Sequence, residues 1–151
     1  MSGDSEGNIC VWDTLKWERD LVIKVGNSSV SSILPLDGDQ SVVTGLGSGE
    51  VCLWDASDWK RKAPLDTTMG EHDRDVRALL EIGAFFVSGS ADAKMSVWSK
   101  ESLGCVEVLN HEDEVNALVA LNLCVDSDGA PSHFASASDD GSVRIWSTAY
   151  S

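Results

Sequence analysis

Hydrophobic and polar residues alternate in short segments along the whole chain. In one set of segments the alternation ends at a tryptophan, as in Ile9–Trp12, Val51–Trp54, Met95–Trp98 and Val143–Trp146. Alternation with a period of two residues is typical of a β-strand that buries one face. No segment has the period of about 3.6 residues that an amphipathic helix requires. The pattern therefore predicts an all-β fold.

The tryptophans that end these segments recur at similar distances. They stand at positions 12, 54, 98 and 146, so the spacings are 42, 44 and 48 residues. A residue with a small hydroxyl group lies ten positions before each of them, namely Ser2, Thr44, Ser88 and Ser136. Self-similarity with a period of this length indicates a repeat architecture.

Three further strands complete each repeat. A second apolar segment leads into the hydroxyl residue, at 41–44, 85–88 and 133–136. Short Gly/Asp/Ser segments separate it from the tryptophan strand, as in a hairpin turn. A third segment precedes this pair, at 29–34, 75–80 and 114–119, and a fourth follows the tryptophan near 20–25, 61–65 and 103–108. Each complete repeat is therefore predicted to form four short antiparallel strands.

In these features the chain resembles the WD-repeat family. The dipeptide that names the family stands at Trp12-Asp13 and Trp54-Asp55, whereas Ser99 and Ser147 replace the aspartate in the later repeats. Residues 88–92 and 136–141 match the family's serine-to-turn segment, and residues 70–72 and 110–111 match a degenerate Gly-His element. The resemblance covers essentially the whole chain. It implies a β-propeller, in which four-stranded blades surround a central channel.

The resemblance also implies a division into blades. Residues 1–25 would form a partial blade, 26–66 and 70–109 two complete blades, and 111–151 a second partial blade. About three and a half blades are too few to close a ring, which needs four to eight. We therefore expect an open arc, and favour a fragment of a larger, seven-bladed propeller. The alternatives are self-association through open edge strands and a ring completed by another protein.

The chain is strongly acidic, and this bears on its partners. It has 25 Asp and Glu against 11 Lys and Arg, for a net charge of −14. Nucleic acids and anionic membranes both require clustered Lys and Arg, so we expect neither as a direct partner. The charge favours a Lys/Arg-rich protein or peptide. The alternative is that the charge serves solubility alone.

The sequence also bears on the compartment. The first six residues are polar and acidic, unlike a secretory signal, and no apolar run approaches the roughly 20 residues that span a bilayer. The four cysteines, at 10, 52, 105 and 124, have no regular close spacing. We therefore expect reduced thiols in a protein of the cytoplasm, with the nucleus as an alternative, and not a secreted protein.

Members of the WD-repeat family often carry a buried hydrogen-bonded tetrad of Trp, Ser or Thr, His and Asp. The resemblance implies two such tetrads here, Trp98–Ser88–His72–Asp92 and Trp146–Ser136–His111–Asp140. In the second repeat Gly26 and Ser48 stand in place of His and Asp, and the first repeat has only Trp12, Ser2 and Glu6. We expect those two repeats to rely more on packing.

The Ser/His/Asp sets do not indicate a hydrolase. They recur beside a tryptophan in successive repeats, whereas a catalytic triad is needed once, and the sequence has no GxSxG nucleophile elbow. It also lacks a phosphate-cradling loop, a dinucleotide fingerprint and Cys/His pairs at metal-ligand spacing. We predict a protein without catalytic activity, cofactor or metal.

The family's ligands commonly meet the face around the channel mouth. Carried over position by position, the resemblance implies contact residues at Asn27, Ser29, Asp73, Asp75, Ala91, Glu112, Glu114 and Asp139. Five of these eight are acidic, so the hypothesis is a basic peptide bound at an acidic mouth, with Arg74 and Arg77 modulating one edge. The alternative is that these are solvated loop carboxylates.

The resulting functional prediction is a non-catalytic scaffold or adaptor. The alternative is the substrate- or histone-recognition part of a ubiquitin ligase or chromatin-modifying complex whose catalytic region lies elsewhere. Residues 123–132 form a longer connection than their counterparts, so we expect an exposed loop there. Such a loop serves either binding or mere decoration.

Overall fold

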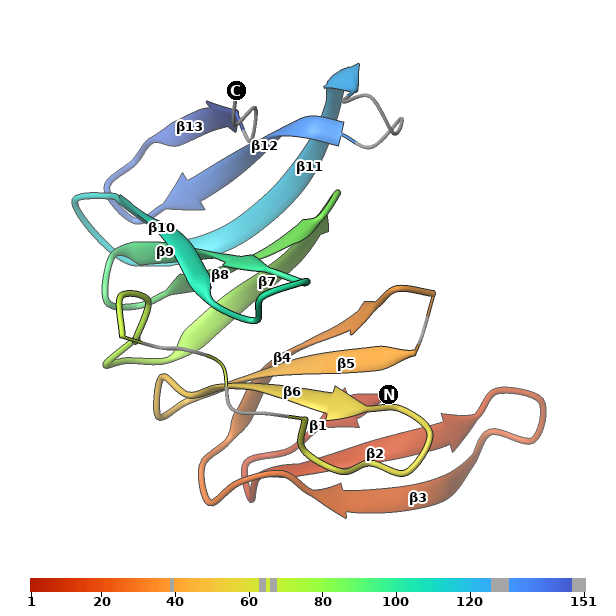
Figure 1. Cartoon of the computed structure of the whole chain (residues 1–151). Helices are drawn as coiled ribbons and strands as arrows, with labels where there is room; N and C mark the ends of the chain where they lie inside the picture. The colour runs from red at the N-terminus through yellow and green to blue at the C-terminus, as the bar shows by residue number, and fades with distance from the viewer. Residues whose placement is uncertain (39, 63–64, 66–67, 126–130, 148–151) are drawn as a thin grey trace.

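Four antiparallel sheets follow one another in chain order (Figure 1). The computed structural model describes residues 1–38, 40–62, 65, 68–125 and 131–147, with the side chains of 123–125 and 131 left out. Within these residues the secondary structure consists of strands and turns, without a helix. The predicted all-β fold, an open arc of propeller blades, is therefore confirmed.

The first two sheets have three strands each. The first sheet contains β1 (Ser2–Gly3), β2 (Asn8–Asp13) and β3 (Glu18–Lys24). The second sheet contains β4 (Val30–Leu36), β5 (Ser41–Leu46) and β6 (Val51–Asp55). Beyond β6, Arg61 pairs with this sheet through an isolated bridge to Trp54. Of the fourth strand expected near 61–65, residues 63 and 64 lie outside the described part of the chain.

The later two sheets differ in strand number. The third sheet contains β7 (Val76–Ile82), β8 (Phe85–Ser90), β9 (Lys94–Ser99) and β10 (Cys105–Asn110). The fourth contains β11 (Val115–Val125), β12 (Pro131–Ser138) and β13 (Val143–Ser147). Consecutive sheets contact one another through their first strands, because β4 contacts β1 and β7, and β7 contacts β11. These four strands form the inner edge of the arc.

The predicted bounds of the loop at residues 123–132 are wrong at both ends. β11 continues to Val125, which pairs with Pro131 at the start of β12. The reason is that Leu123, Cys124 and Val125 are apolar, which extends the strand before the acidic residues begin. Residues 126–130, the remainder of the predicted loop, lie outside the described residues.

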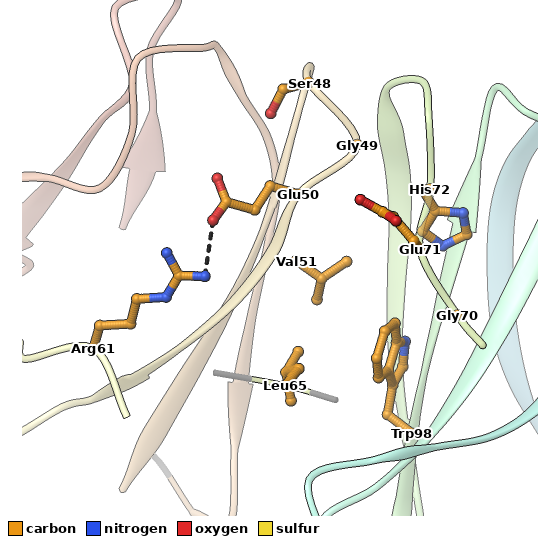
Figure 2. A pocket seen from close by; sticks show the side chains of 10 residues that line it. All are labelled: Ser48, Gly49, Glu50, Val51, Arg61, Leu65, Gly70, Glu71, His72 and Trp98. Carbon is orange, nitrogen blue, oxygen red and sulfur yellow. Dashed lines mark ion pairs between the residues drawn. The ribbon is translucent and has the colours of Figure 1, made fainter. Parts of the chain in front are cut away.

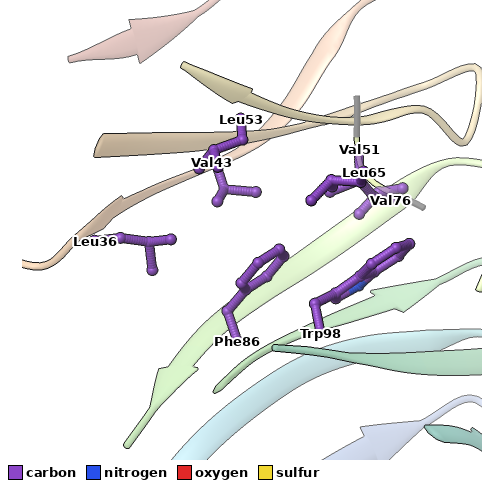
Figure 3. Packing of buried hydrophobic residues seen from close by; sticks show 8 residues of the cluster. All are labelled: Leu36, Val43, Val51, Leu53, Leu65, Val76, Phe86 and Trp98. Atoms are coloured by element: carbon purple, nitrogen blue, oxygen red, sulfur yellow. The ribbon is translucent and has the colours of Figure 1, made fainter. Parts of the chain in front are cut away.

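The hydrophobic core lies between the sheets, as three clusters at three junctions. Each sheet has a tryptophan face, which carries Trp12, Trp54, Trp98 or Trp146 in turn, and an opposite aliphatic face. At the junction of the second and third sheets, Phe86 and Trp98 contact Val43 and Leu53 of the preceding sheet (Figure 3). The aliphatic face of one sheet thus packs against the tryptophan face of the next.

Glycine lets the inner strands approach closely. Gly45 and Gly89 directly follow the repeat's hydroxyl residue, as Gly3 does in the first sheet. A Cβ atom at Gly45 would lie 2.5 Å from Val76 Cγ1, and one at Gly89 would lie 2.8 Å from Val115 Cγ1. These glycines therefore provide the space that the first valine of the next inner strand fills.

Candidate partner-binding face

A continuous chain of hydrogen bonds runs through the third sheet. Trp98 Nε1 donates to Ser88 Oγ at 2.9 Å, and His72 Nε2 lies 2.8 Å from the same oxygen. His72 Nδ1 lies 3.0 Å from Asp92 Oδ2. An indole can only donate, so a neutral imidazole with its proton on Nδ1 satisfies every group in the chain. Trp98, Ser88 and His72 are buried.

The fourth sheet repeats this arrangement. Trp146 Nε1 donates to Ser136 Oγ at 2.8 Å, and His111 Nε2 lies 2.7 Å from that oxygen. His111 Nδ1 lies 2.9 Å from Asp140 Oδ2. All eight residues that the sequence assigns to two tetrads are thus brought together in two groups. Because each polar atom is already paired for structural reasons, the geometry gives no indication of a nucleophile.

The tetrad aspartates are held ionised. Burial of Asp92 would by itself raise the pKa of its carboxyl group, but the hydrogen bond from His72, with backbone N–H groups of Lys94 and Asp73, holds the pKa below its ordinary value. The pKa of Asp140 is lowered far below its ordinary value, chiefly by hydrogen bonds from Ser142 and His111. Both carboxylates are therefore acceptors at neutral pH.

Each tetrad aspartate also anchors a loop. The backbone N–H of Asp73 donates to Asp92 Oδ2 at 3.3 Å, and that of Glu112 donates to Asp140 Oδ2 at 3.2 Å. Asp73 and Glu112 are the residues that directly follow the tetrad histidines. The buried network therefore positions the first predicted contact residue of each loop.

A second backbone bond recurs in three repeats and joins the remaining contact residues in pairs. The N–H of Ala91 donates to the carbonyl of Asp75 at 2.9 Å, and the N–H of Asp139 donates to the carbonyl of Glu114 at 3.0 Å. In the second sheet the N–H of Gly47 donates to Ser29 at 2.9 Å. The sequence analysis did not include Gly47 among the loop residues of this face. It could have done so, because Gly47 occupies the same position in its repeat as Ala91 and Asp139 do in theirs. Ala91 itself is buried, so it offers a partner no exposed side chain.

Arginines neutralise the centre of this face. Glu114 forms ion pairs with Arg74 at 3.1 Å and with Arg77 at 2.5 Å. Arg77 Nε also lies 3.8 Å from Asp75 Oδ2. Its guanidinium donates to Asn116 at 2.6 Å, and Asn116 in turn donates to Asp139. Three of the five predicted carboxylates are therefore engaged within the protein, a pairing that spacing along the chain did not reveal.

The two other carboxylates remain open to a partner. Asp73 and Glu112 are exposed, and within the described residues their side chains make no ion pair or hydrogen bond. Asn27 is also exposed but carries no charge, and Ser29 is half-buried. We call Asp73 and Glu112, together with the paired residues between them, the acidic face. It belongs to the third and fourth sheets.

A cavity of about 360 Å³ adjoins this face between the second and third sheets. Figure 2 shows Val51, Leu65 and Trp98 below, with the Glu71 side chain directed into the gap. Glu50 pairs with Arg61 across 2.8 Å, whereas Glu71 forms no ion pair with any residue of the described part of the chain. No sequence motif indicated this cavity, because residues from three separate segments line it.

The first two sheets lack the His–Asp part of the tetrad. Trp12 Nε1 donates to Ser2 Oγ and Trp54 Nε1 to Thr44 Oγ1, each at 3.0 Å. In the second sheet a Cβ atom at Gly26 would lie 2.8 Å from Leu46 Cδ1. The buried Leu46 side chain thus occupies the neighbourhood of the missing histidine.

The described residues offer no metal or disulfide site. They contain no group of three or more His, Cys, Asp or Glu side chains arranged to hold a metal ion. Cys10 and Cys52 are free thiols, and the Cys105 thiol donates to the carbonyl of Glu107 at 3.3 Å. Burial, with the charge of Glu50, raises the pKa of the Cys52 thiol to about 12, so this thiol is unreactive at neutral pH. No helix within the described part is long and apolar enough to cross a lipid bilayer.

Comparison with known proteins agrees with this geometry. Residues 103–147, which include the last tetrad tryptophan and serine, match the family profile described as WD domain, G-beta repeat. The sheet order and tetrads extend the same pattern to the earlier repeats. Residues 103–147 thus carry a WD repeat, and the chain as a whole resembles WD-repeat β-propellers in fold.

Solved structures are similar to this chain along 96% of its length. The computationally designed Ika4 protein is 26% identical, with a TM-score of 0.77 and 82% of its chain covered. The designed Ika8 protein is also 26% identical, with a TM-score of 0.76 and 41% covered. The WD40 β-propeller domain of Doa1 is 19% identical, with a TM-score of 0.78 and 45% covered, a likeness of fold alone. The chain thus spans less than half of two of these structures. Its likeness to WD40 propellers indicates a protein-interaction scaffold.

Proposed function

We propose that this WD-repeat protein is a non-catalytic interaction scaffold whose acidic face binds a Lys/Arg-rich segment of a partner protein. The observation that carries the proposal is the pair of exposed carboxylates at Asp73 and Glu112. Each lies on a loop whose backbone is tied to a buried tetrad aspartate, at 3.3 Å and 3.2 Å. Carboxylates on anchored loops bind a cation without first losing much conformational freedom.

Arg74 and Arg77 restrict where a basic partner can bind on the acidic face. Arg74 and Arg77 already neutralise Glu114 at the centre of the face. A basic partner would therefore contact the flanking carboxylates, and its Lys and Arg side chains would lie to either side of the arginine pair. Like-charge repulsion from Arg74 and Arg77 would then select partners whose basic residues have a matching spacing.

The adjoining cavity supports an anchor for one side chain. Glu71 and Asp73 flank the same tetrad histidine, so the cavity and the acidic face share a loop. A Lys or Arg side chain has an apolar stem that suits Val51 and Leu65 and a charged head that suits Glu71. Concave sites with an apolar wall and few polar groups are the usual ligand pockets.

The test is the binding of a fluorescently labelled peptide of alternating lysine and glycine to two double variants. D73N/E112Q removes two charges from the acidic face, and the matched control D20N/E101Q removes two exposed charges elsewhere. Exposed charges contribute about 0.2–1 kcal/mol each, so we expect roughly 2- to 30-fold weaker binding for the first variant only, with a flatter salt dependence. Equal loss in both variants would mean that net charge alone attracts the peptide, and the proposal would be wrong.

Recognition of substrates or histones for a ubiquitin ligase or chromatin modifier would use the same surface. In that case the catalytic group would belong to another region or subunit. No contact on this chain favours such a complex over a simple scaffold, so scaffolding stands as the proposed function.

A further inference from the structure

Arg74 lies between the two exposed carboxylates of the acidic face. It directly follows Asp73 on the loop before β7. Its Nη2 atom lies 3.1 Å from Oε1 of Glu114, which stands two residues after Glu112 on the loop before β11. The side chain therefore crosses from the third sheet to the fourth. A partner that contacts both Asp73 and Glu112 would pass beside this guanidinium.

At this point the surface displays a cation rather than an anion. The Arg74 side chain is 60% exposed, whereas that of Glu114 is only 18% exposed. Arg77, the second partner of Glu114, is 34% exposed. The carboxylate thus lies deeper than either guanidinium, and two positive charges share its one negative charge. The centre of the acidic face is therefore basic, with an exposed acid on either side.

The Arg74 guanidinium keeps donors available for a partner. Nη1 donates to the carbonyl of Ala91 at 3.0 Å and Nη2 pairs with Glu114, while Nε makes no hydrogen bond or ion pair with the described residues. A guanidinium has five N–H donors, so most of those of Arg74 have no acceptor in the described part of the chain. Because these two contacts hold the group in place, it can bind an acceptor without first becoming ordered.

The neighbouring aspartates are engaged with other side chains. Asp75 accepts a hydrogen bond from Ser31. Asp139 accepts one from Asn116 at 2.5 Å. Neither aspartate forms a hydrogen bond or ion pair with Arg74. The remaining donors of Arg74 are therefore not used by the carboxylates that lie around it.

An arginine at this position is specific to one repeat. Two residues before the first valine of the inner strand, successive repeats carry Ser28, Arg74 and Asp113. The backbone hydrogen bond that closes this loop forms in all three repeats, at 2.9, 2.9 and 3.0 Å. The loop therefore does not require an arginine to fold, and the cation is available for another use.

We infer that the partner segment carries a carboxylate between its basic residues and that Arg74 binds this carboxylate. The inference rests on the proposed function, because basic side chains at Asp73 and Glu112 would bring the segment to the guanidinium. Guanidinium and carboxylate form two parallel hydrogen bonds when they meet. A phosphate group would be held less well, because the chain's net charge of −14 repels its second negative charge. The partner's charges thus run basic, acidic, basic.

The test is fluorescence anisotropy with two matched series of the lysine–glycine peptide. In one series a single interior residue is glutamate, and in the other the same residue is glutamine. If net charge alone governed binding, every glutamate peptide would bind more weakly than its glutamine counterpart, because the chain is acidic. We expect the reverse at the interior position that meets Arg74, where glutamate should bind roughly two- to fivefold more tightly.

Substitutions of Arg74 show whether this residue causes the preference. Arg74→Gln should abolish the preference for glutamate. Arg74→Lys should restore only part of it, because an ammonium group lacks the two parallel donors. Arg19→Gln is the matched control, because Arg19 is an exposed residue of β3 in the first sheet. This control should keep the full preference.

Failure of this inference is distinguishable from failure of the proposed function. A lysine–glycine peptide that does not bind at all overturns both. A peptide that binds, but gains nothing from glutamate at any interior position, overturns the inference alone. A glutamate preference that survives Arg74→Gln also overturns it. Phosphoserine that binds more tightly than glutamate at the preferred position overturns the assignment to a carboxylate.

Discussion

The second and third sheets bury the same indole group in different ways. Both tryptophans donate to a hydroxyl, Trp54 to Thr44 at 3.0 Å and Trp98 to Ser88 at 2.9 Å. In the third sheet the hydroxyl continues through His72 to Asp92. In the second sheet the polar chain ends at the hydroxyl, and the buried Leu46 lies beside Gly26.

This difference reaches the surface. Asp92 accepts a hydrogen bond from the backbone of Asp73 at the start of a loop, and no equivalent bond reaches Asn27 among the described residues. The loops of the third and fourth sheets are bonded to a tetrad aspartate and carry exposed acids, whereas the loop of the second sheet has neither feature. A buried indole is therefore satisfied by a hydroxyl alone. The additional histidine and aspartate hold the backbone of the following loop in place.

The largest effect should come from removal of the tetrad histidine. His72→Ala leaves the Ser88 hydroxyl proton without its acceptor, removes the imidazole donor of the Asp92 carboxylate and opens a cavity, so we expect a loss of about 3 kcal/mol in the free energy of unfolding. Thr44→Val in the second sheet removes one acceptor and should cost about 1 kcal/mol. Urea unfolding of both variants measures the difference. Equal costs would mean that the two sheets are stabilised alike.

Acid should loosen the later sheets before the second. Because the folded-state pKa values of Asp92 and Asp140 lie below their ordinary value, their contribution is present above about pH 4 and is lost as pH falls through the folded values. Tryptophan fluorescence of single-tryptophan variants that keep Trp54 or Trp98 would follow each sheet from pH 5 to pH 2. A change in Trp54 fluorescence at a higher pH than the change in Trp98 fluorescence would contradict this prediction.

The smallest effect concerns one turn residue. Gly7, Gly49 and Gly141 occupy the same left-handed turn position in three repeats, with φ of 81°, 93° and 80°, whereas Ala93 has a φ of 68° in the third. Ala93→Gly should therefore stabilise the protein by up to about 1 kcal/mol, since an alanine in this region is strained. A higher urea midpoint is the expected result. A lower midpoint would show that the turn of the third sheet bears no strain.

Local patterns explain why the fold was predictable. The strands could be located because alternation and the tryptophan spacing reflect burial within each repeat, a property of neighbouring residues. The prediction of a loop was wrong at Leu123–Val125, where three apolar residues continue the strand β11. The fourth strand expected near 61–65 stays a prediction, because residues 63 and 64 lie outside the described part and Arg61 pairs with Trp54 through one bridge.

The candidate site was less predictable because its charges pair between sheets. Arg77 of β7 reaches Glu114, which directly precedes β11, and no spacing along the chain encodes that ion pair. Ala91 was expected at the surface but is buried, because its loop is drawn against Asp75 by a backbone bond. The register of repeats could place these residues on one face, but it could not show which carboxylates stay free.

We propose that the partner binds the acidic loops of the third and fourth sheets, which are bonded to the tetrad aspartates. Amide hydrogen exchange tests it directly, because the N–H groups of Gly47, Ala91 and Asp139 make the same bond in three successive repeats. With the lysine–glycine peptide bound, Ala91, Asp139 and residues 73–75 and 112–114 should exchange more slowly, while Gly47 and residues 27–29 should not change. Equal protection of Gly47, or protection confined to the second sheet, would contradict the account.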